Sequence, residues 1–250
     1  MIVFVTGATA GFGSAIARRF ARDGHRIVAA GRRRERLDAL RKEIGEALLP
    51  VELDVRDRGA VLRAFESLPA DFSAVDILVN NAGLALGLEG AQSANLDEWD
   101  AMIDTNVKGL MYCTRAALPG MVARDRGHVV NIGSVAAMYP YPGGNVYGAS
   151  KAFVHQFSLN LRADLLGTAV RVTDVQPGMC SGTEFSQVRF KGDAARAAKV
   201  YEGVHALSAD DVADTVHWVA TRPAHMNVNV VEVMPVAQAF NLFKYDRKGG

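Results

Sequence analysis

Short apolar runs alternate with segments of helical periodicity along almost the whole of this 250-residue chain. An apolar run of a few residues suits a buried strand, and apolar residues that recur every three or four positions mark one face of a helix. Strands that alternate with helices build a parallel sheet with helices on both faces. The sequence therefore predicts an α/β fold, a single doubly wound domain of the Rossmann type. Its seven strands are expected at residues 2–5, 27–30, 51–55, 75–79, 129–132, 170–175 and 228–233.

Helical periodicity fills the gaps between these runs. The apolar repeat of the second helix extends from Leu37 to Leu48, and a long helix is expected to begin near Asn95. No linker or change in composition divides the chain. One domain is therefore expected over residues 1–240, followed by a polar tail over residues 241–250 that we expect to be partly disordered.

The composition argues against several classes of partner. Lys and Arg number 28 and Asp and Glu 27, so the net charge of +1 gives no long-range attraction to nucleic acid or to an anionic membrane. No apolar run reaches membrane-spanning length, and the apolar start of the chain indicates a strand rather than a signal peptide. The two cysteines, Cys113 and Cys180, have neither disulfide nor zinc spacing. A soluble protein of the reducing cytoplasm, without a metal site, is expected.

A glycine-rich turn, residues 6–13, lies between the first strand and the first helix. Glycine lets the backbone approach a ligand closely, and the free N–H groups at a helix start attract a phosphate. The spacing differs from GxGxxG and lacks the GK[ST] ending of a nucleoside-triphosphate loop. Its position favours nucleotide binding over a merely tight turn. The candidate cofactor residues here are Gly7, Ala8, Thr9, Ala10, Gly11, Phe12 and Gly13.

Arginines follow the second strand, at the position that sets cofactor choice in a dinucleotide fold. An acidic residue here would hold a ribose 2′-hydroxyl, whereas arginine accommodates a 2′-phosphate. Arg32 and Arg33 therefore favour NADP over NAD, although a solvated basic start to the next helix explains them as well. Asp54, expected at the end of the third strand, is a candidate to accept a hydrogen bond from the adenine amino group. Its alternative role is a cap on the next helix.

Polar residues also stand where later strands end, and ligands bind at the carboxyl ends of parallel strands. Asn80-Asn81-Ala82-Gly83 ends the fourth strand, and Ser134 follows the fifth, although such residues also satisfy the backbone of turns. Asn106 lies within the long helix, where asparagine is a mediocre helix former and needs another reason to be present. After the sixth strand come Pro177-Gly178 and a polar run, residues 179–193, that could form a mobile lid.

Tyr147 and Lys151 are four residues apart on an expected helix, so they lie on the same face about 6 Å apart along the axis. A nearby ammonium favours the ionised form of a phenol, whose pKa is otherwise about 10. Such a tyrosine can exchange a proton with a substrate oxygen. Because a helical Tyr and Lys at this spacing usually form a solvated surface contact, the pair gains weight only from the motifs that precede it.

Together these motifs resemble the short-chain dehydrogenase/reductase family over almost the whole chain. The matching residues, in the family's order and spacing, are Thr6-Gly7 with Gly11 and Gly13, Asn80-Asn81-Ala82-Gly83, Asn106, Ser134, Tyr147 with Lys151, and Pro177-Gly178. Five stretches are similar, more narrowly, to the bacterial NADP-dependent 3-hydroxy acid dehydrogenases that act on serine and L-allo-threonine. They are residues 7–13, 84–87, 143–148, 182–186 and 188–193.

The resemblance implies a role for each matching residue. Tyr147 is the expected proton donor and acceptor, Ser134 orients the same substrate oxygen, and Lys151 holds the nicotinamide ribose and lowers the tyrosine pKa. Asn106 is expected to position a water that links Lys151 to solvent. The other implied cofactor contacts are Arg32 and Arg33 at the 2′-phosphate, Asp54 and Val55 at the adenine, Asn81 near the ribose with Ala82 and Gly83 beside it, and Pro177, Gly178, Thr183 and Phe185 over the nicotinamide.

The expected function is the interconversion of a small 3-hydroxy acid, of the serine, allo-threonine or 3-hydroxypropionate type, with its oxo partner. An acidic substrate needs a cation near the cleft. Arg189 and Lys191 are the candidates, although both could equally be exposed charges of a lid. The family resemblance also implies that the helices near residues 96–125 and 145–166 pair between subunits in a homotetramer.

Three alternatives remain open at this point. One is a short-chain reductase of another small carbonyl compound, such as sulfoacetaldehyde, a ketone or a diketone. Another is a cofactor-sensing protein without catalysis, which would need the glycine turn but not the tyrosine, lysine and serine. The third is a sugar-nucleotide epimerase or dehydratase, which usually has a longer chain with a substrate domain.

Overall fold

Seven parallel strands form one sheet, of order β3-β2-β1-β4-β5-β6-β7, in a computed structural model that describes residues 1–240. The predicted fold class is confirmed, while the predicted tail, residues 241–250, lies outside the described residues. The strand order reverses between β1 and β4, and ligands bind at such a switch point in doubly wound sheets. The strands are β1 (Ile2–Thr6), β2 (Arg26–Gly31), β3 (Leu48–Glu52), β4 (Ile77–Asn80), β5 (Gly127–Ile132), β6 (Val170–Pro177) and β7 (Val230–Val233).

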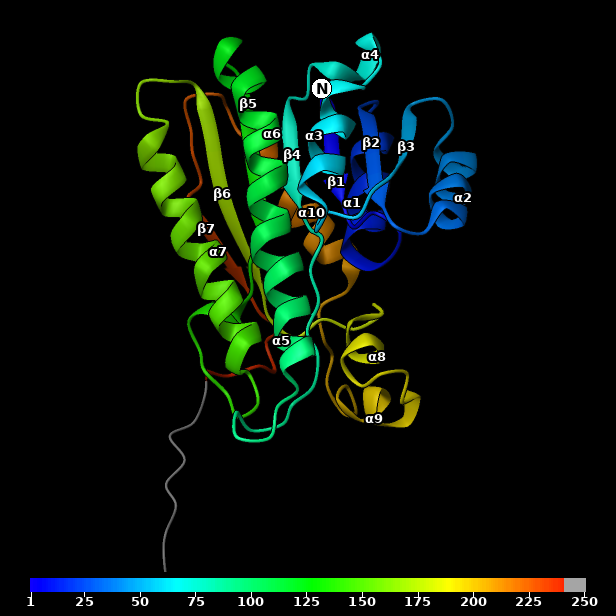
Figure 1. Cartoon of the computed structure of the whole chain (residues 1–250), viewed down its shortest axis with the longest axis vertical. Helices are drawn as coiled ribbons and strands as arrows, with labels where there is room; N and C mark the ends of the chain where they lie inside the picture. Colours follow the sequence, from blue (N-terminus) through cyan, green and yellow to red (C-terminus); the bar gives the residue numbers. More distant parts are fainter. Residues whose placement is uncertain (241–250) are drawn as a thin grey trace, which may run out of the picture.

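Helices cover both faces of the sheet (Figure 1). The core on one face receives side chains from α3, α6 and α7, and the core on the other face receives them from α1, α2 and α10. No described helix has the length and hydropathy needed to cross a membrane. The helices are α1 (Gly11–Arg22), α2 (Arg34–Ile44), α3 (Arg58–Glu66), α4 (Ala70–Ser73), α5 (Leu96–Ile103), α6 (Leu110–Ala123), α7 (Asn145–Asp164), α8 (Phe185–Arg189), α9 (Ala194–Lys199) and α10 (Ala209–Ala220).

The central strands are apolar at nearly every position because both of their faces are covered. Successive residues of a strand point to opposite faces. Val3 and Val5 of β1 accordingly join the core beneath α1 and α10, whereas Phe4 joins the core beneath α3 and α6. Each such fully buried side chain contributes about 1.5–3 kcal/mol relative to exposure. Successive apolar residues of one strand therefore enter two different cores, which the sheet separates.

The third strand differs from its prediction. It occupies Leu48–Glu52 rather than residues 51–55, so Leu48 opens a strand instead of extending the helix before it. Gly45, at φ +85°, ends α2 earlier, because glycine adopts this left-handed conformation without steric cost. Leu48 then pairs with Ile27 of β2. As a result Asp54 lies in the loop beyond the strand.

The long helix predicted near residues 96–125 is divided into three parts. Asn95 caps α5 by accepting a hydrogen bond from Asp97 N at 2.8 Å. A π-helical turn, Asp104–Gly109, joins α5 to α6 and contains the fully buried Asn106. Widened turns of this kind occur mainly at functional sites. The helix irregularity thus coincides with the residue whose presence in a helix required an explanation.

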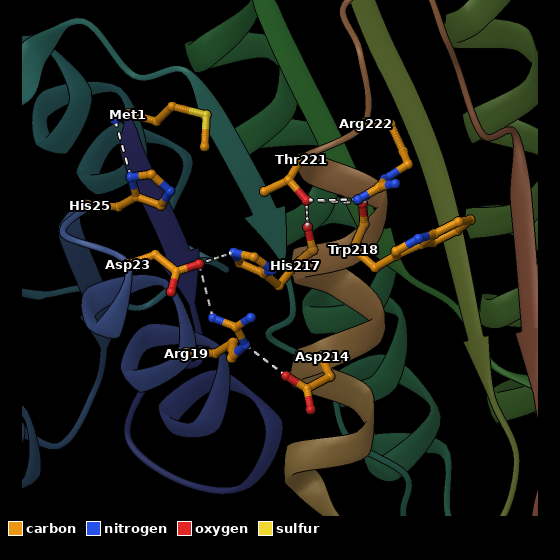
Figure 2. Close-up of polar contacts among 9 residues, drawn as sticks. All are labelled: Met1, Arg19, Asp23, His25, Asp214, His217, Trp218, Thr221 and Arg222. Atoms are coloured by element: carbon orange, nitrogen blue, oxygen red, sulfur yellow. Dashed lines mark hydrogen bonds and ion pairs between the residues drawn. The ribbon is translucent and has the colours of Figure 1, made fainter.

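Charged side chains join α1 to α10, the first and last helices of the described chain (Figure 2). Arg19 contacts Asp214 at 2.7 Å and Asp23 at 3.1 Å, and His217 Nε2 lies 2.7 Å from Asp23 Oδ2. Beneath these groups the rings of Phe20 and His217 meet with centroids 5.0 Å apart. Exposed ion pairs contribute little to stability. The apolar contact between α1 and α10 therefore does most to hold these two helices together on their face of the sheet.

Candidate active site

A cavity of about 280 Å³ opens where β1, β2, β4 and β5 end. Many of the predicted site residues line it: Gly7, Thr9, Ala10, Gly11, Phe12, Arg32, Arg33, Asp54, Val55, Asn81, Ala82, Gly83, Tyr147, Lys151, Thr183 and Phe185. The lining residues that were not predicted individually as site residues are Gly31, Leu53, Leu84, Ala85, Thr105, Ile132, Gly133, Glu184 and Val188. The cavity therefore lies at the switch point of the sheet and runs from the first turn to Tyr147.

The first turn offers backbone N–H groups to this cavity. Ala10 is the N-cap residue of α1, and no side chain caps this helix, whereas Ser208 caps α10 with its hydroxyl. Ala10, Gly11 and Phe12 all line the cavity. Uncapped N–H groups at a helix N-terminus attract a phosphate, so this turn fits a pyrophosphate.

Gly13 and Ala8 support the turn from behind rather than lining the cavity. A Cβ on Gly13 would collide with Gly7 O and would lie 2.6 Å from Asn81 Nδ2. Asn81 Nδ2 donates to Thr6 O at 2.8 Å, which ties the end of β4 to the turn. Ala8 is completely buried in the core. These two residues therefore permit close packing of the turn, and their direct contact with a cofactor stays a prediction.

The arginines after β2 are held in place by two neighbours. Arg33 donates from Nε and Nη2 to Thr9 Oγ1, at 3.2 and 2.9 Å. Glu184 Oε2 lies 2.9 Å from Arg33 Nη2, and its Oε1 accepts from Arg36 Nη1 at 2.6 Å. The hydrogen bond from Arg33, followed by that from Arg36, lowers the pKa of Glu184. Arg32 is exposed and lines the cavity. Positive charge thus gathers where a 2′-phosphate is expected.

Asp54 does not cap the next helix, because Asp57 performs that role by accepting from Ala60 N at 2.9 Å. The Asp54 carboxylate instead accepts three donors of Arg56: the backbone N, Nε and Nη2, the last at 2.6 Å. The hydrogen bond from the Arg56 side chain is the main reason that the pKa of Asp54 is lowered. Asp54 and Val55 both line the cavity, so both are placed to contact an adenine there. The adenine contact itself stays a prediction.

Three side chains converge at the other end of the cavity, each almost fully buried: Tyr147 and Lys151 from α7, and Ser134 from just beyond β5. Lys151 Nζ lies 5.9 Å from the centroid of the Tyr147 ring and donates to Ile132 O at 2.8 Å. The Ser134 hydroxyl acts on the Tyr147 phenol as well and lowers its pKa. The structure therefore brings together the three residues that the sequence places far apart.

Burial dominates the titration of this site. It raises the pKa of Tyr147 to about 12, against the opposing effects of the hydrogen bond to Ser134 and the charge of Arg189. Burial also lowers the pKa of Lys151 to about 8, and the negative charge of Asp174 opposes this shift. The expected lowering of the tyrosine pKa is therefore not what this structure shows, because the cost of burying a phenolate outweighs the nearby positive charges.

Both polar atoms of the Asn106 side-chain amide form hydrogen bonds within the protein. Its Oδ1 accepts from Leu84 N at 2.9 Å, and its Nδ2 donates to Leu84 O at 2.9 Å and to Ser150 Oγ at 3.0 Å. A Cβ on Gly83 would lie 3.3 Å from Asn106 Oδ1 and 3.5 Å from Lys151 Nζ. Asn106 is thus next to the lysine and orders the loop after β4, while its implied role in positioning a water stays a prediction.

The segment after β6 closes the cavity from the side opposite the sheet. Pro177 and Gly178 are not part of the lining, and Gly178 N donates to Val233 O at 2.8 Å. Thr183 faces Gly11, and the Phe185 ring meets the Tyr147 ring edge-on with centroids 5.7 Å apart. Figure 1 shows α8 and α9 at the lower end of the molecule, near the start of α5.

Arg189 and Lys191 are separated by the structure. The Arg189 guanidinium lies 5.7 Å from the centroid of the Tyr147 ring, and its Nη2 donates to Tyr141 Oη at 2.8 Å. Its Nε donates to Gly87 O at 3.1 Å. Lys191 is exposed and pairs with Glu98 at 2.5 Å. Of these two candidates, only Arg189 therefore lies beside Tyr147, and no motif distinguished it from Lys191.

A Rossmann-type sheet, a phosphate-binding turn at its switch point and a buried tyrosine with lysine and serine define a dehydrogenase of the nicotinamide-dependent class. Residues 1–194 match the family model described as short chain dehydrogenase, and the chain belongs to this family.

Known proteins of similar sequence and structure agree with this assignment. The NADP-dependent 3-hydroxy acid dehydrogenase YdfG of Salmonella typhi is 63% identical over 240 residues, which are 96% of this chain and 97% of that protein. Serine 3-dehydrogenase of Agrobacterium fabrum is 49% identical, with 98% of each chain covered. The solved structure of the closed form of serine dehydrogenase complexed with NADP+ superposes with a TM-score of 0.98 at 58% identity, covering 99% of this chain and 100% of that one.

Proposed function

We propose that this protein is an NADP-dependent dehydrogenase that interconverts a small 3-hydroxy acid with its 3-oxo acid or semialdehyde. The observation that carries the proposal is the Arg189 guanidinium, which lies beside the ring of the buried Tyr147. Relatives named as 3-hydroxy acid and serine dehydrogenases support the same substrate class.

The residues of the cavity fit NADP. The uncapped start of α1 suits its pyrophosphate, and Arg32 and Arg33 suit its 2′-phosphate. A solved structural relative is described as complexed with NADP+. When bound, NADP supplies the carbon that takes or gives the hydride, while the protein supplies position and charge.

Tyr147 and Ser134 hold the substrate oxygen in this mechanism. The raised pKa keeps the phenol protonated at neutral pH, which suits donation of a proton to the oxygen during reduction. In the direction of oxidation Tyr147 accepts the hydroxyl proton, and the positive charge of Lys151 stabilises the phenolate that this requires. Ser134 donates or accepts a hydrogen bond at the same oxygen and orients it.

Arg189 binds the carboxylate of the substrate. Its contacts with Tyr141 and Gly87 use Nη2 and Nε, and among the described residues Nη1 has no partner. The carboxylate of a 3-hydroxy acid is two bonds from the carbon that reacts. A guanidinium 5.7 Å from the centre of the Tyr147 ring is therefore within reach of the carboxylate when the hydroxyl lies at the phenol.

Replacement of Arg189 tests this assignment. In Arg189→Gln we expect kcat/KM for 3-hydroxypropionate and L-serine to fall about 10- to 100-fold, because a charge-assisted hydrogen bond contributes about 1.5–3 kcal/mol. Oxidation of 2-propanol, which has no carboxylate, should change less than about threefold. The rates would be followed at the absorbance of NADPH, with Lys191→Gln as the matched control and Tyr147→Phe as the inactive reference. Equal losses with the acids and with 2-propanol would show that Arg189 acts on Tyr147 and not on a carboxylate.

A second candidate function is reduction of another small carbonyl compound. The guanidinium of Arg189 binds a sulfonate as readily as a carboxylate, so sulfoacetaldehyde fits the same position. Turnover of sulfoacetaldehyde with NADPH, together with none for any 3-hydroxy acid, would favour this alternative. A cofactor-sensing protein without catalysis is disfavoured, because it has no need for the converging Tyr147, Lys151 and Ser134.

A further inference from the structure

A buried carboxylate that belongs to none of the motifs lies behind the reacting side chains. Asp174 of β6 has no exposed surface. Its Oδ2 accepts from Gln176 Nε2 at 2.6 Å and lies 3.0 Å from His155 Nδ1. Its Oδ1 is buried without a hydrogen-bond partner among the described residues. An unpaired buried carboxylate oxygen is costly, so its retention at this position needs a physical reason.

The unpaired oxygen is directed at the backbone that carries the catalytic groups. A Cβ on Gly133 would collide with Asp174 Oδ1. Gly133 follows Ile132, whose carbonyl accepts the hydrogen bond of Lys151, and it precedes Ser134. His155, which contacts the carboxylate, is one helical turn beyond Lys151 on α7. The carboxylate therefore lies against the β5 backbone next to the carbonyl that holds Lys151, and against α7 one turn beyond Lys151.

We propose that Asp174, held by His155 and Gln176, is a positioning residue whose negative charge keeps Lys151 protonated and fixed to the Ile132 carbonyl. The proposal rests on the proposed oxidoreductase function, because only a charged Lys151 stabilises the phenolate form of Tyr147. Moving an ammonium out of water is costly, and a carboxylate close by offsets that cost.

Within residues 1–240, Asp174 is the one carboxylate whose charge acts on Lys151. From α7, Tyr147 and His155 face the region of Lys151, and from β5 come only the backbone of Ile132 and Gly133 and the hydroxyl of Ser134. On the π-helical turn, Asp104 and Lys108 pair with each other at 2.7 Å and are directed to solvent. Arg189 is a further cation beside Tyr147. Burial raises the pKa of Asp174, and Gln176 and His155 oppose this shift and so favour the carboxylate.

The direction of the effect follows from these charges. Burial alone lowers the pKa of Lys151, and Asp174 opposes that shift. Removing the charge of Asp174 lowers the pKa further, so Lys151 loses its proton at a lower pH. The rate of alcohol oxidation then begins to fall at a lower pH on the alkaline side of its profile.

The test is the pH profile of kcat for alcohol oxidation in Asp174→Asn, which keeps the shape of the side chain. With saturating NADP+, we expect the alkaline limb to move down by about one pH unit. Asp76→Asn is the control, because Asp76 is a partly buried carboxylate at the opposite end of the sheet, where it accepts from Ile2 N at 2.9 Å and pairs with Arg126 at 3.1 Å. Its alkaline limb should coincide with that of the wild type.

His155→Gln provides a second, independent variant. Glutamine can still donate a hydrogen bond to the Asp174 carboxylate and leaves its charge in place, so the alkaline limb should stay where it is in the wild type. A limb that does not move in Asp174→Asn, with activity reduced equally at every pH, would assign Asp174 a purely structural role and overturn the proposal. A shift in His155→Gln as large as the one expected for Asp174→Asn would show that packing of the cluster, and not the charge of Asp174, sets the alkaline limb, and it would overturn the proposal even if Asp174→Asn failed to fold.

The assay separates this proposal from the substrate assignment. Both 3-hydroxypropionate and 2-propanol would be used as substrates. If neither 3-hydroxypropionate nor L-serine is oxidised, the 3-hydroxy acid function fails. The shift in the pH profile can still be measured with 2-propanol, and its presence or absence decides the role of Asp174.

Discussion

Burial shifts the pKa values of Tyr147 and Lys151 more than their neighbours do. Ser134 and the charge of Arg189 both lower the pKa of Tyr147, yet burial raises it to about 12. Lys151 has a carboxylate behind it, yet its pKa is lowered to about 8. Both shifts favour the neutral form, which is the general effect of a desolvated site. Charges that approach Tyr147 during the reaction therefore have a large effect, because little solvent screens them.

His128 lies away from the active site, and its pKa tests the effect of burial on stability. It lies in β5 with its Nε2 2.8 Å from Thr173 Oγ1, and burial lowers its pKa to about 3. The unfolded chain binds a proton at this residue below pH 6.5, whereas the folded chain does not until about pH 3. Stability is therefore lost as the pH falls from 6.5 towards 3, by at most about 1.4 kcal/mol per pH unit. Urea unfolding at pH 7 and pH 5 would measure this loss.

The loss should be smaller in His128→Gln, which has no titrating group. His205→Gln, at an exposed position, should lose as much stability between the two pH values as the wild type does. If the His128 variant showed the same loss as the wild type, acid sensitivity would originate elsewhere.

Irregular elements, rather than regular ones, complete the site. The π-helical turn Asp104–Gly109 directs Asn106 to Leu84 and Ser150. The segment around α8 reaches both ends of the cavity, with Glu184 at the arginines after β2 and Arg189 beside Tyr147. A single segment thus contacts the cofactor side and the substrate side of the cavity, which suits a lid that closes over both ligands.

Glu184 should link the position of this segment to the cofactor. In Glu184→Gln the ion pairs with Arg33 and Arg36 are lost, and we expect NADPH to dissociate about two- to fivefold faster, since partly exposed ion pairs contribute little. Stopped-flow fluorescence of bound NADPH would measure the rate. Glu202→Gln is the control, because Glu202 is exposed and forms no ion pair among the described residues. Slower dissociation in Glu184→Gln would mean that the carboxylate mainly repels the 2′-phosphate.

On the scale of the whole molecule, the sheet collects residues that are distant in the sequence at one edge. Gly7, Asn81 and Ser134 come from three different connections, after β1, β4 and β5. Arg189 comes from the segment after β6. The long helices α5, α6 and α7 lie together over one face of the sheet (Figure 1). Large apolar residues here are not all covered: Leu96 of α5 is 68% exposed, and Leu166, just beyond α7, is 81% exposed.

We expect these helices to pair between subunits in a homotetramer. Exposed apolar residues on adjoining helices favour association, and Met111 and Val122 of α6 are partly exposed in the same way. Light scattering at micromolar concentration should give a mass of about four chains of 26.8 kDa each. A particle with the mass of a single chain would contradict this expectation.

The regular parts of the fold could be predicted from the sequence because their signals are local. The apolar runs of β1 and β2 and the helical stripe of Ile16 and Phe20 need only a few neighbouring residues to be recognised. The predicted extension of the second helix to Leu48 was wrong, because a leucine at a helical interval also suits a strand. Pairing with Ile27, a residue about twenty positions away, decided between the two structures.

Residue types and spacings by themselves determined the sheet, the phosphate-binding turn, the Tyr147–Lys151 pair and the preference for NADP. Only the tertiary structure decided which of Arg189 and Lys191 joins the active site, and only it placed Asp174 behind Lys151. The physical reason is the range of the interactions. Periodicity and turn chemistry act over a few residues, whereas burial, which sets the pKa values of Tyr147 and Lys151, depends on every segment that packs around them.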